Sequence, residues 1–152
     1  KTMNTSNDIR EFLAQKHIAV AGYSRDPKKF GHLVFKTLVE KGYEAYPVNP
    51  AGGTTPRGNA IYENIDSLPD SVTALVVVTP RNHSEVIVRK GLEKGLKSFW
   101  LQQMSDSPQA LSLLNNDELN VISGKCILMH ANPGGIHKFH RWLAGLFGRL
   151  PQ

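Results

Sequence analysis

Cysteine is almost missing from this sequence, which has a single one, Cys126, among its 152 residues. A lone cysteine cannot close an internal disulfide, and chains from oxidising compartments usually depend on disulfides. Long apolar runs are missing as well, because stretches such as residues 75–78 are far shorter than the roughly 20 residues that cross a bilayer. No charged segment followed by an apolar run opens the chain as a secretory signal would. We therefore expect a cytoplasmic protein with no membrane partner.

Charge of one sign is not concentrated in any segment. The sequence holds 18 lysines and arginines against 13 acidic residues, a formal net charge of +5, but no run of five basic residues. A net positive charge attracts anions, whereas specific nucleic-acid binding needs a basic patch or a recognition motif. We expect a small anionic cofactor as the partner and no nucleic acid.

Catalytic and metal-binding motifs are also lacking. The chain has no G-x-S-x-G elbow, no Ser-His-Asp order and no G-x-x-x-x-G-K-[ST] loop. His137 and His140 share one face of a predicted helix, but no pattern of further ligands completes a zinc set. Cys126 has only the charge of Lys125 beside it in sequence, and a free cysteine is more typically a small buried hydrophobe. We expect no catalytic residue and no metal site, and the reactivity of Cys126 stays open.

What the sequence does contain is an alternation of short apolar runs and amphipathic segments. Its composition, 40% hydrophobic and 20% charged, is that of an ordinary globular domain. The alternation predicts βαβ units. We therefore predict an α/β fold, a Rossmann-like doubly wound parallel five-stranded sheet with helices on both faces, in a single domain over residues 1–152. The expected strands are 17–22, 44–48, 72–79, 97–101 and 119–122, and the expected helices are 5–15, 30–41, 62–67, 82–94, 108–115 and 135–148.

Short polar side chains indicate where two of these helices begin. Asn7 or Asp8 is expected to cap the first helix. Asn82 is expected to cap the helix over 82–94, with Glu85 three residues later in the position of a capping box.

The expected last helix, residues 135–148, has a broad apolar face that includes Phe139, Trp142 and Phe147. Most such faces pack on their own domain, which is the interpretation we favour. The alternative is a contact with a second copy or with a partner protein, since large aromatic residues anchor interfaces. Binding to a membrane surface is the least favoured.

Turn-forming residues directly follow several predicted strands, at residues 22–25, 49–50, 79–80 and 102. In open α/β sheets, ligands bind beyond the carboxyl ends of the strands, at the point where the strand order reverses. The four segments therefore converge on one candidate site.

The first of these turns reads GYSRDPKKFGH and suits a phosphate group. Gly22 permits a sharp bend, Ser24 offers a hydroxyl, and the helix start behind them attracts anions through its amides and dipole. Arg25, Lys28 and Lys29 add positive charge, and arginine binds phosphate with two hydrogen bonds at once.

The same turn differs from the G-x-G-x-x-G motif of NAD-binding domains, because Ser24 and residues 26–27 replace the glycine spacing. NAD-binding domains also place an acid at the end of the second strand, where this chain has Asn49 and Pro50. Asn49 either anchors the turn or borders the ligand, and Pro50 offers a flat apolar edge to an adenine. An NAD(P)-binding oxidoreductase remains the alternative, with Arg57 available for a 2′-phosphate.

The segments GYSRDP, YPVNP, VTP, FWLQ and GKCILMH occur in this order and resemble the stand-alone CoA-binding domain family. The N-terminal domain of the succinyl-CoA synthetase α subunit is similar to a lesser degree, and its loop shares the GGTT of residues 52–55. The resemblance covers about residues 16–130. It implies a five-stranded doubly wound sheet that holds coenzyme A, free or acylated, by its nucleotide end.

The residues that the resemblance assigns to the site all lie at strand ends or in the turns that follow. The pyrophosphate would be wrapped by Gly22, Tyr23, Ser24 and Arg25, with Lys29 as a further phosphate contact. The adenosine would lie between Asn49 and Pro50 on one side and Thr79 and Pro80 on the other, and Gln102 would line the crevice. Tyr23 replaces a small residue of the family, so it either crowds the turn or stacks on the ligand.

The function that the resemblance implies is a non-catalytic CoA-binding protein, as a sensor, a carrier or a subunit of a larger assembly. In the synthetases the phosphohistidine lies in a second domain that this sequence does not contain, so we expect no ligase activity from this chain alone. A third possibility is an interaction module that keeps the fold and has lost the ligand.

Overall fold

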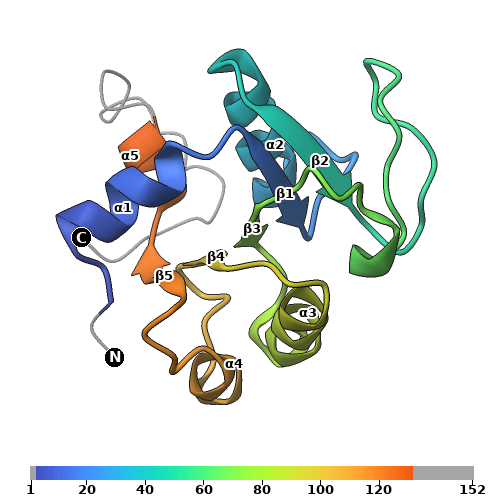
Figure 1. Cartoon of the computed structure of the whole chain (residues 1–152). Helices are drawn as coiled ribbons and strands as arrows, with labels where there is room; N and C mark the ends of the chain where they lie inside the picture. The colour runs from blue at the N-terminus through green and yellow to red at the C-terminus, as the bar shows by residue number, and fades with distance from the viewer. Residues whose placement is uncertain (1–2, 132–152) are drawn as a thin grey trace.

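The fold is built on a five-stranded parallel sheet with the strand order β2-β1-β3-β4-β5. The computed structural model describes residues 3–131 (Figure 1). The strands are β1 His17–Ala21, β2 Glu44–Val48, β3 Ala74–Val77, β4 Ser98–Gln102 and β5 Asn120–Lys125. The helices are α1 Ser6–Leu13, α2 Phe30–Glu40, the 3-10 turn η1 Ile65–Ser67, α3 Arg81–Glu93, α4 Pro108–Leu113 and α5 Ile127–Ala131. The predicted Rossmann-like α/β architecture is thus confirmed; the helix expected at 135–148 lies outside the described residues.

The central strands β1 and β3 are almost wholly apolar because both faces of the sheet are covered there. On one face, α1, α2 and α5 enclose a core that includes Phe12, Val34 and Trp100 (Figure 1). On the other face, α3 and α4 enclose a core that includes Val88 and Phe99. Fully burying a side chain of this size contributes about 1.5–3 kcal/mol. A strand with both sides buried has no polar face, which is why β3 is the most apolar segment of the sequence.

The strand order reverses between β1 and β3. The chain runs from β1 through α2 to β2 on one side, and then crosses back to β3 on the other side of β1. Ala21 at the end of β1 therefore pairs with Val48 of β2 and with Val77 of β3. Open α/β sheets bind ligands beyond the strand ends at such a reversal, so the fold puts the candidate site over the carboxyl end of β1.

Two of the expected helix caps differ from the structure. Thr5 is the N-cap of α1, and Asp8 completes the capping box: Asp8 N–H donates to Thr5 Oγ1 at 3.0 Å and Thr5 N–H donates to Asp8 Oδ2 at 3.1 Å. The box expected from Asn82 and Glu85 is wrong, because α3 already begins at Arg81 with Pro80 as its N-cap and no side-chain cap. The proline ring holds φ at −53°, which suits a helix start and leaves Asn82 inside the helix.

Two further segments depart from the sequence expectations. The helix expected at 62–67 is only the single turn η1. Helix α5 was not expected, and it follows β5 directly because the buried Gln102 side chain accepts a hydrogen bond from Ile127 N–H, at the start of that helix. A contact between residues so distant in sequence leaves no local signal.

Candidate functional site

The turn after β1 has a conformation that glycine alone adopts without strain. Gly22 has a φ of +99°, and a Cβ on it would lie 2.8 Å from the Val78 carbonyl oxygen. The N–H groups of Gly22 and Tyr23 both donate to the carbonyl oxygen of Val48 at 3.2 Å. The turn is therefore held between the ends of β2 and β3, as the sequence predicts for Gly22.

Helix α2 lies so close to this turn that no side chain would fit at Gly31. A Cβ on Gly31 would lie 2.1 Å from the carbonyl oxygen of Gly22. The helix begins at Phe30 with Lys29 as its N-cap, and no side chain caps it. Its positive dipole end thus faces the strand tips, where an anion is stabilised. Gly31 was not predicted as a site residue; its only sequence signal is a glycine inside an amphipathic helix pattern.

The loop between Gly22 and α2 is ordered by its own polar groups. Ser24 Oγ accepts a hydrogen bond from Asp26 N–H at 3.1 Å, and Asp26 Oδ1 accepts one from Lys28 N–H at 2.9 Å. His32 Nδ1 lies 2.9 Å from the carbonyl oxygen of Ser24. Because a carbonyl only accepts, His32 carries a proton on Nδ1. The loop is preorganised before any ligand arrives.

Arg25 lies at the tip of this loop and extends over the glycine-rich segment after β2. A Cβ on Gly53 would be 3.5 Å from Arg25 Nη2, so the guanidinium lies directly against the bare backbone of Gly53. Arg25 is exposed, and the ion pairs among residues 3–131 do not include it. Its charge is available to an anion at the rim.

Asn49 joins the first turn to the second. Its Nδ2 donates to the carbonyl oxygen of Tyr23 at 2.6 Å, its Oδ1 accepts from Ala51 N–H at 2.8 Å, and its own N–H donates to Tyr62 at 2.8 Å. Of the two interpretations of Asn49, the structure supports the anchor. Pro50 beside it is exposed and remains the surface that this turn offers to a ligand.

Thr79 and Pro80 form the wall on the β3 side. Thr79 is buried; its Oγ1 lies 3.0 Å from Ser84 Oγ, and its carbonyl oxygen accepts from Ser105 Oγ at 2.7 Å. This second bond ties the end of β3 to the turn after β4. Pro80 is exposed at the start of α3.

The ring of Tyr23 does not line the rim. It is 1% exposed, packs edge-on against Phe35 at 5.0 Å between ring centroids, and stacks on His32 at 5.7 Å. Burial raises the pKa of the Tyr23 phenol, against the opposing effect of the Arg25 charge, so the phenol is neutral. The ring therefore neither crowds the turn nor is placed to stack on a ligand at the rim. The backbone of Tyr23 faces the strand tips, while its side chain packs in the core.

Gln102 also lies elsewhere than expected. Its side chain is 3% exposed and holds Ile127 N–H at 3.1 Å instead of lining the crevice. It also bonds Cys126, whose thiol pKa is raised by burial, although that bond and the amides of Leu128 and Met129 oppose the shift. A raised pKa keeps the thiol protonated at neutral pH, and the protonated thiol is a poor nucleophile.

One acidic side chain was missed near the tip of β2. Tyr62 pairs with Val48 as an isolated parallel bridge, and the next residue, Glu63, comes alongside Gly52. A Cβ on Gly52 would lie 3.1 Å from Glu63 Oε2. The strand itself ends without an acid, as predicted, but a returning segment brings a carboxylate to the same place.

The structure thus gathers most of the predicted site around the end of β1. Gly22, the backbone of Tyr23, Asn49 and Thr79 are joined by direct contacts, and exposed groups surround them. These exposed groups are Arg25, Lys29, Pro50 and Pro80, with Ser24 half-buried among them. Gln102 alone of the predicted residues is engaged on a different part of the sheet edge.

Residues 3–131 lack both a metal-binding cluster and a membrane-spanning helix. These residues hold no group of three histidine, cysteine or acidic side chains placed to bind a metal ion. None of the helices that they form has the length and apolar character needed to cross a membrane. His137 and His140 lie outside this range.

Comparison with known proteins finds relatives over most of the described residues. A family model described as a CoA binding domain matches residues 16–132. Among curated proteins, the α subunit of ADP-forming acetate–CoA ligase I of Pyrococcus furiosus is 36% identical over 54% of this chain. The match spans only 19% of that subunit's length.

Two further relatives are closer to this chain in size. YneT, an uncharacterised protein of Bacillus subtilis, is 31% identical, with 79% of this chain and 89% of that protein covered. A solved structure of a hypothetical protein from Pyrococcus horikoshii superposes with a TM-score of 0.76 at 27% identity, over 92% of this chain and 93% of that one. The same scaffold therefore occurs both inside a ligase subunit and in a chain of similar length.

Proposed function

Since this chain belongs to the CoA-binding domain family, we propose that the rim around the end of β1 holds the nucleotide end of coenzyme A. The observation that carries the proposal is the turn at Gly22. It is locked to β2 and β3 and has the uncapped start of α2 packed directly behind it. A diphosphate is the ligand group that such a turn and helix start favour.

The phosphates would be bound mainly by charge. Arg25 is exposed without a carboxylate partner in the described part of the chain, and Lys28 and Lys29 lie on the same loop. Hydrogen bonds to charged groups contribute about 1.5–3 kcal/mol each. The ordered Ser24–Asp26 loop lowers the entropy lost on binding, because its conformation is set beforehand.

The adenosine would lie between the exposed faces of Pro50 and Pro80, one on each side of the β1 end. Asn49 would act indirectly, because both of its polar side-chain atoms already bond the backbone. Thr79 would likewise shape the wall from within. The two exposed prolines offer flat apolar faces against which a purine ring can pack.

The role we propose is non-catalytic and stand-alone, with residues 1–152 as a single domain in a reducing, cytoplasmic setting. Burial raises the pKa of the Cys126 thiol, which supports a role in which this cysteine is not a nucleophile. A ligase partner subunit is the natural alternative, since one relative is part of such an enzyme. Assembly with a partner or a second copy is compatible with either role.

Calorimetric titration with CoA tests the proposal. Arg25→Ala removes one charged contact, so we expect an affinity loss of about tenfold or more. Arg10→Ala is the matched control: it makes the same change in net charge on an exposed residue of α1. Unchanged affinity for Arg25→Ala removes Arg25 from the site. Failure of the unmodified chain to bind CoA favours the ligand-free interaction module instead.

A second candidate, an NAD(P)-binding domain, is favoured by Glu63, because a carboxylate beside the β2 tip is the group that binds ribose hydroxyls in such domains. Thermal-shift measurements with CoA, NAD and NADP separate the two. The proposal predicts a larger rise in melting temperature with CoA than with either dinucleotide; the reverse order overturns it.

A further inference from the structure

The turn after β4 has a backbone conformation that favours glycine, but the residue that adopts it is a methionine. Met104 has a φ of +78°, in the left-handed region. Ser105 N–H donates to the Gln102 carbonyl oxygen at 2.8 Å, so Met104 is the third residue of a four-residue turn. Glycine or asparagine normally supplies a positive φ at that position. The methionine therefore strains the backbone, and residues strained in this way cluster at functional sites.

The side chain of Met104 gains nothing from the core of its own protein. It is 69% exposed and is one of two large apolar side chains that are largely exposed within residues 3–131. The other, Val86, lies within α3. Methionine is flexible and polarizable, and it is frequent on surfaces that adapt to ligands. The backbone and the side chain of Met104 are both unfavourable for the free protein, as is expected where a residue serves binding instead of folding.

This turn is fixed to the rim. Ser105, the residue after Met104, donates from Oγ to the carbonyl oxygen of Thr79 at 2.7 Å, and both residues are buried. Strand β4 is the second strand from β1 in the sheet, so the ends of the two strands are about 10 Å apart. A ligand group that extends from the rim across the end of β3 therefore reaches Met104.

The sheet edge beside this turn is open. A hollow of about 460 Å³ lies between the start of α3 and the start of α4, with Arg81 on one side and Ser107 on the other. Arg81 directly follows Pro80 of the rim, and Ser107 is three residues beyond Met104. A flexible chain that leaves the rim on this side has space in which to extend.

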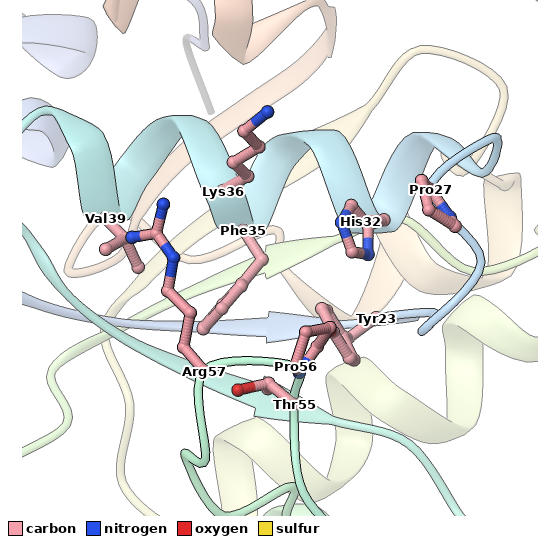
Figure 2. A pocket seen from close by; sticks show the side chains of 9 residues that line it. All are labelled: Tyr23, Pro27, His32, Phe35, Lys36, Val39, Thr55, Pro56 and Arg57. Atoms are coloured by element: carbon pink, nitrogen blue, oxygen red, sulfur yellow. The ribbon is translucent and has the colours of Figure 1, made fainter.

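The rim turn after β1 offers no comparable apolar contact. Its aromatic side chain, Tyr23, packs in the core against Phe35 and His32 (Figure 2). The two exposed prolines of the rim are assigned to the adenosine in the function proposed above. Met104 is therefore the exposed apolar side chain at this edge that another part of the ligand can contact.

We propose that Met104 contacts the pantetheine arm of coenzyme A, the flexible chain that links the diphosphate to the thiol. The inference rests on the proposed CoA site at the rim and adds the part of the ligand that the rim leaves unplaced. The arm leaves the diphosphate, crosses the end of β3 beside Thr79, and packs its dimethyl and methylene groups against the Met104 side chain. Met104 thus distinguishes ligands that carry this arm from nucleotides that end at the diphosphate.

Calorimetric titration with two ligands tests the inference. CoA carries the arm, whereas adenosine 3′-phosphate 5′-diphosphate ends where the arm would begin. Met104→Ala should weaken CoA binding about three- to tenfold, because it removes most of an apolar contact, and should leave the affinity for the nucleotide unchanged. Met104→Leu keeps an apolar side chain and should retain the affinity for CoA. Val86→Ala shortens the other exposed apolar side chain and is the control that should change neither affinity.

Two further measurements separate binding from folding. Met104→Gly should raise the melting temperature of the free protein while weakening CoA binding as much as Met104→Ala does. In wild-type protein labelled with ¹³C at the methionine methyl groups, the Met104 resonance should shift with CoA and not with the nucleotide.

The outcomes distinguish this inference from the function on which it rests. If both ligands bind and the Met104 variants weaken both equally or neither, the inference is overturned while the rim site stands. A Met104 methyl resonance that CoA leaves unmoved has the same consequence. If neither ligand binds the unmodified chain, the proposed function fails and this inference fails with it.

Discussion

Asn49 Nδ2 donates a hydrogen bond of 2.6 Å to the backbone carbonyl of Tyr23 and so ties the turn after β2 to the turn after β1. It adds to the two bonds by which Gly22 and Tyr23 N–H already join the turn after β1 to the Val48 carbonyl at the end of β2. Because the same side chain also accepts from Ala51 N–H, it sets the conformation of both loops at once. The rim is therefore a single rigid unit. Substitution of Asn49 should lower both the stability of the fold and the affinity for CoA.

Asn49→Ala should lower the free energy of unfolding by about 1–3 kcal/mol, chiefly because it leaves the part-buried carbonyl of Tyr23 without its partner, while the exposed Ala51 amide can bond water. For a chain of this length that is a fall in melting temperature of about 2–4 °C per kcal/mol. CoA affinity should fall as well, since the loops are no longer held together. Asn7→Ala, an exposed position on α1, is the control and should change neither quantity. Wild-type stability in Asn49→Ala contradicts the anchor role.

Gly31→Ala should be strongly destabilising although it lies within a helix. Alanine normally improves a helix interior by about 1 kcal/mol relative to glycine, but here its Cβ would lie 2.1 Å from the Gly22 carbonyl oxygen. We expect a net loss of at least about 3 kcal/mol in urea unfolding, comparable with overpacking a core. Gly42→Ala is the comparison, because it meets only the strain of a φ of +92° in open space, about 1–2 kcal/mol. Equal losses would show that α2 can move away from the turn.

Met104→Gly should stabilise the protein. Met104 has a φ of +78°, a conformation that glycine adopts without strain, and its side chain is 69% exposed. Relief of that strain should exceed the extra chain entropy of glycine and raise the free energy of unfolding by about 0.5–1 kcal/mol. Met104→Ala removes the same side chain but keeps the strain, so it should leave stability unchanged. A stabilising alanine would mean that the side chain, and not the backbone, is unfavourable.

Cys126 should react slowly with a thiol reagent such as DTNB. Burial raises its pKa, so at pH 7–8 it forms less thiolate than an unperturbed cysteine. The rate should therefore keep rising with pH beyond the usual range of a thiol. The folded state holds the thiol proton more tightly than the unfolded state does. The stability that this proton contributes is therefore lost as the pH rises above the pKa of the thiol in the unfolded chain. A rate that levels off near neutral pH contradicts the burial effect.

Much of the fold was predictable because its signals are local. The apolar strands are buried on both faces, and Gly22 follows the first strand where a bend is required. The gathering of Gly22, Asn49 and Thr79 at one edge was predictable for the same reason, since parallel strands end at one edge. Asn49 emerged as the anchor only when the partner carbonyl of Tyr23 was known.

What escaped prediction depends on contacts between distant segments. The close packing at Gly31, the carboxylate of Glu63 beside Gly52, and the start of α5 at Gln102 all depend on segments far apart in sequence. The side chain of Tyr23 is a further example. Its position in the turn suggested contact with the ligand, but its ring packs against Phe35 and His32. Tertiary packing decided the direction of that side chain.

The most direct test of CoA binding at the rim is a crystal structure of this chain grown with CoA. The account predicts the diphosphate at the start of α2, within hydrogen-bond distance of the Ser24–Arg25 turn, and the adenine between Pro50 and Pro80. A rim left empty at saturating CoA, or CoA bound elsewhere on the molecule, would contradict it.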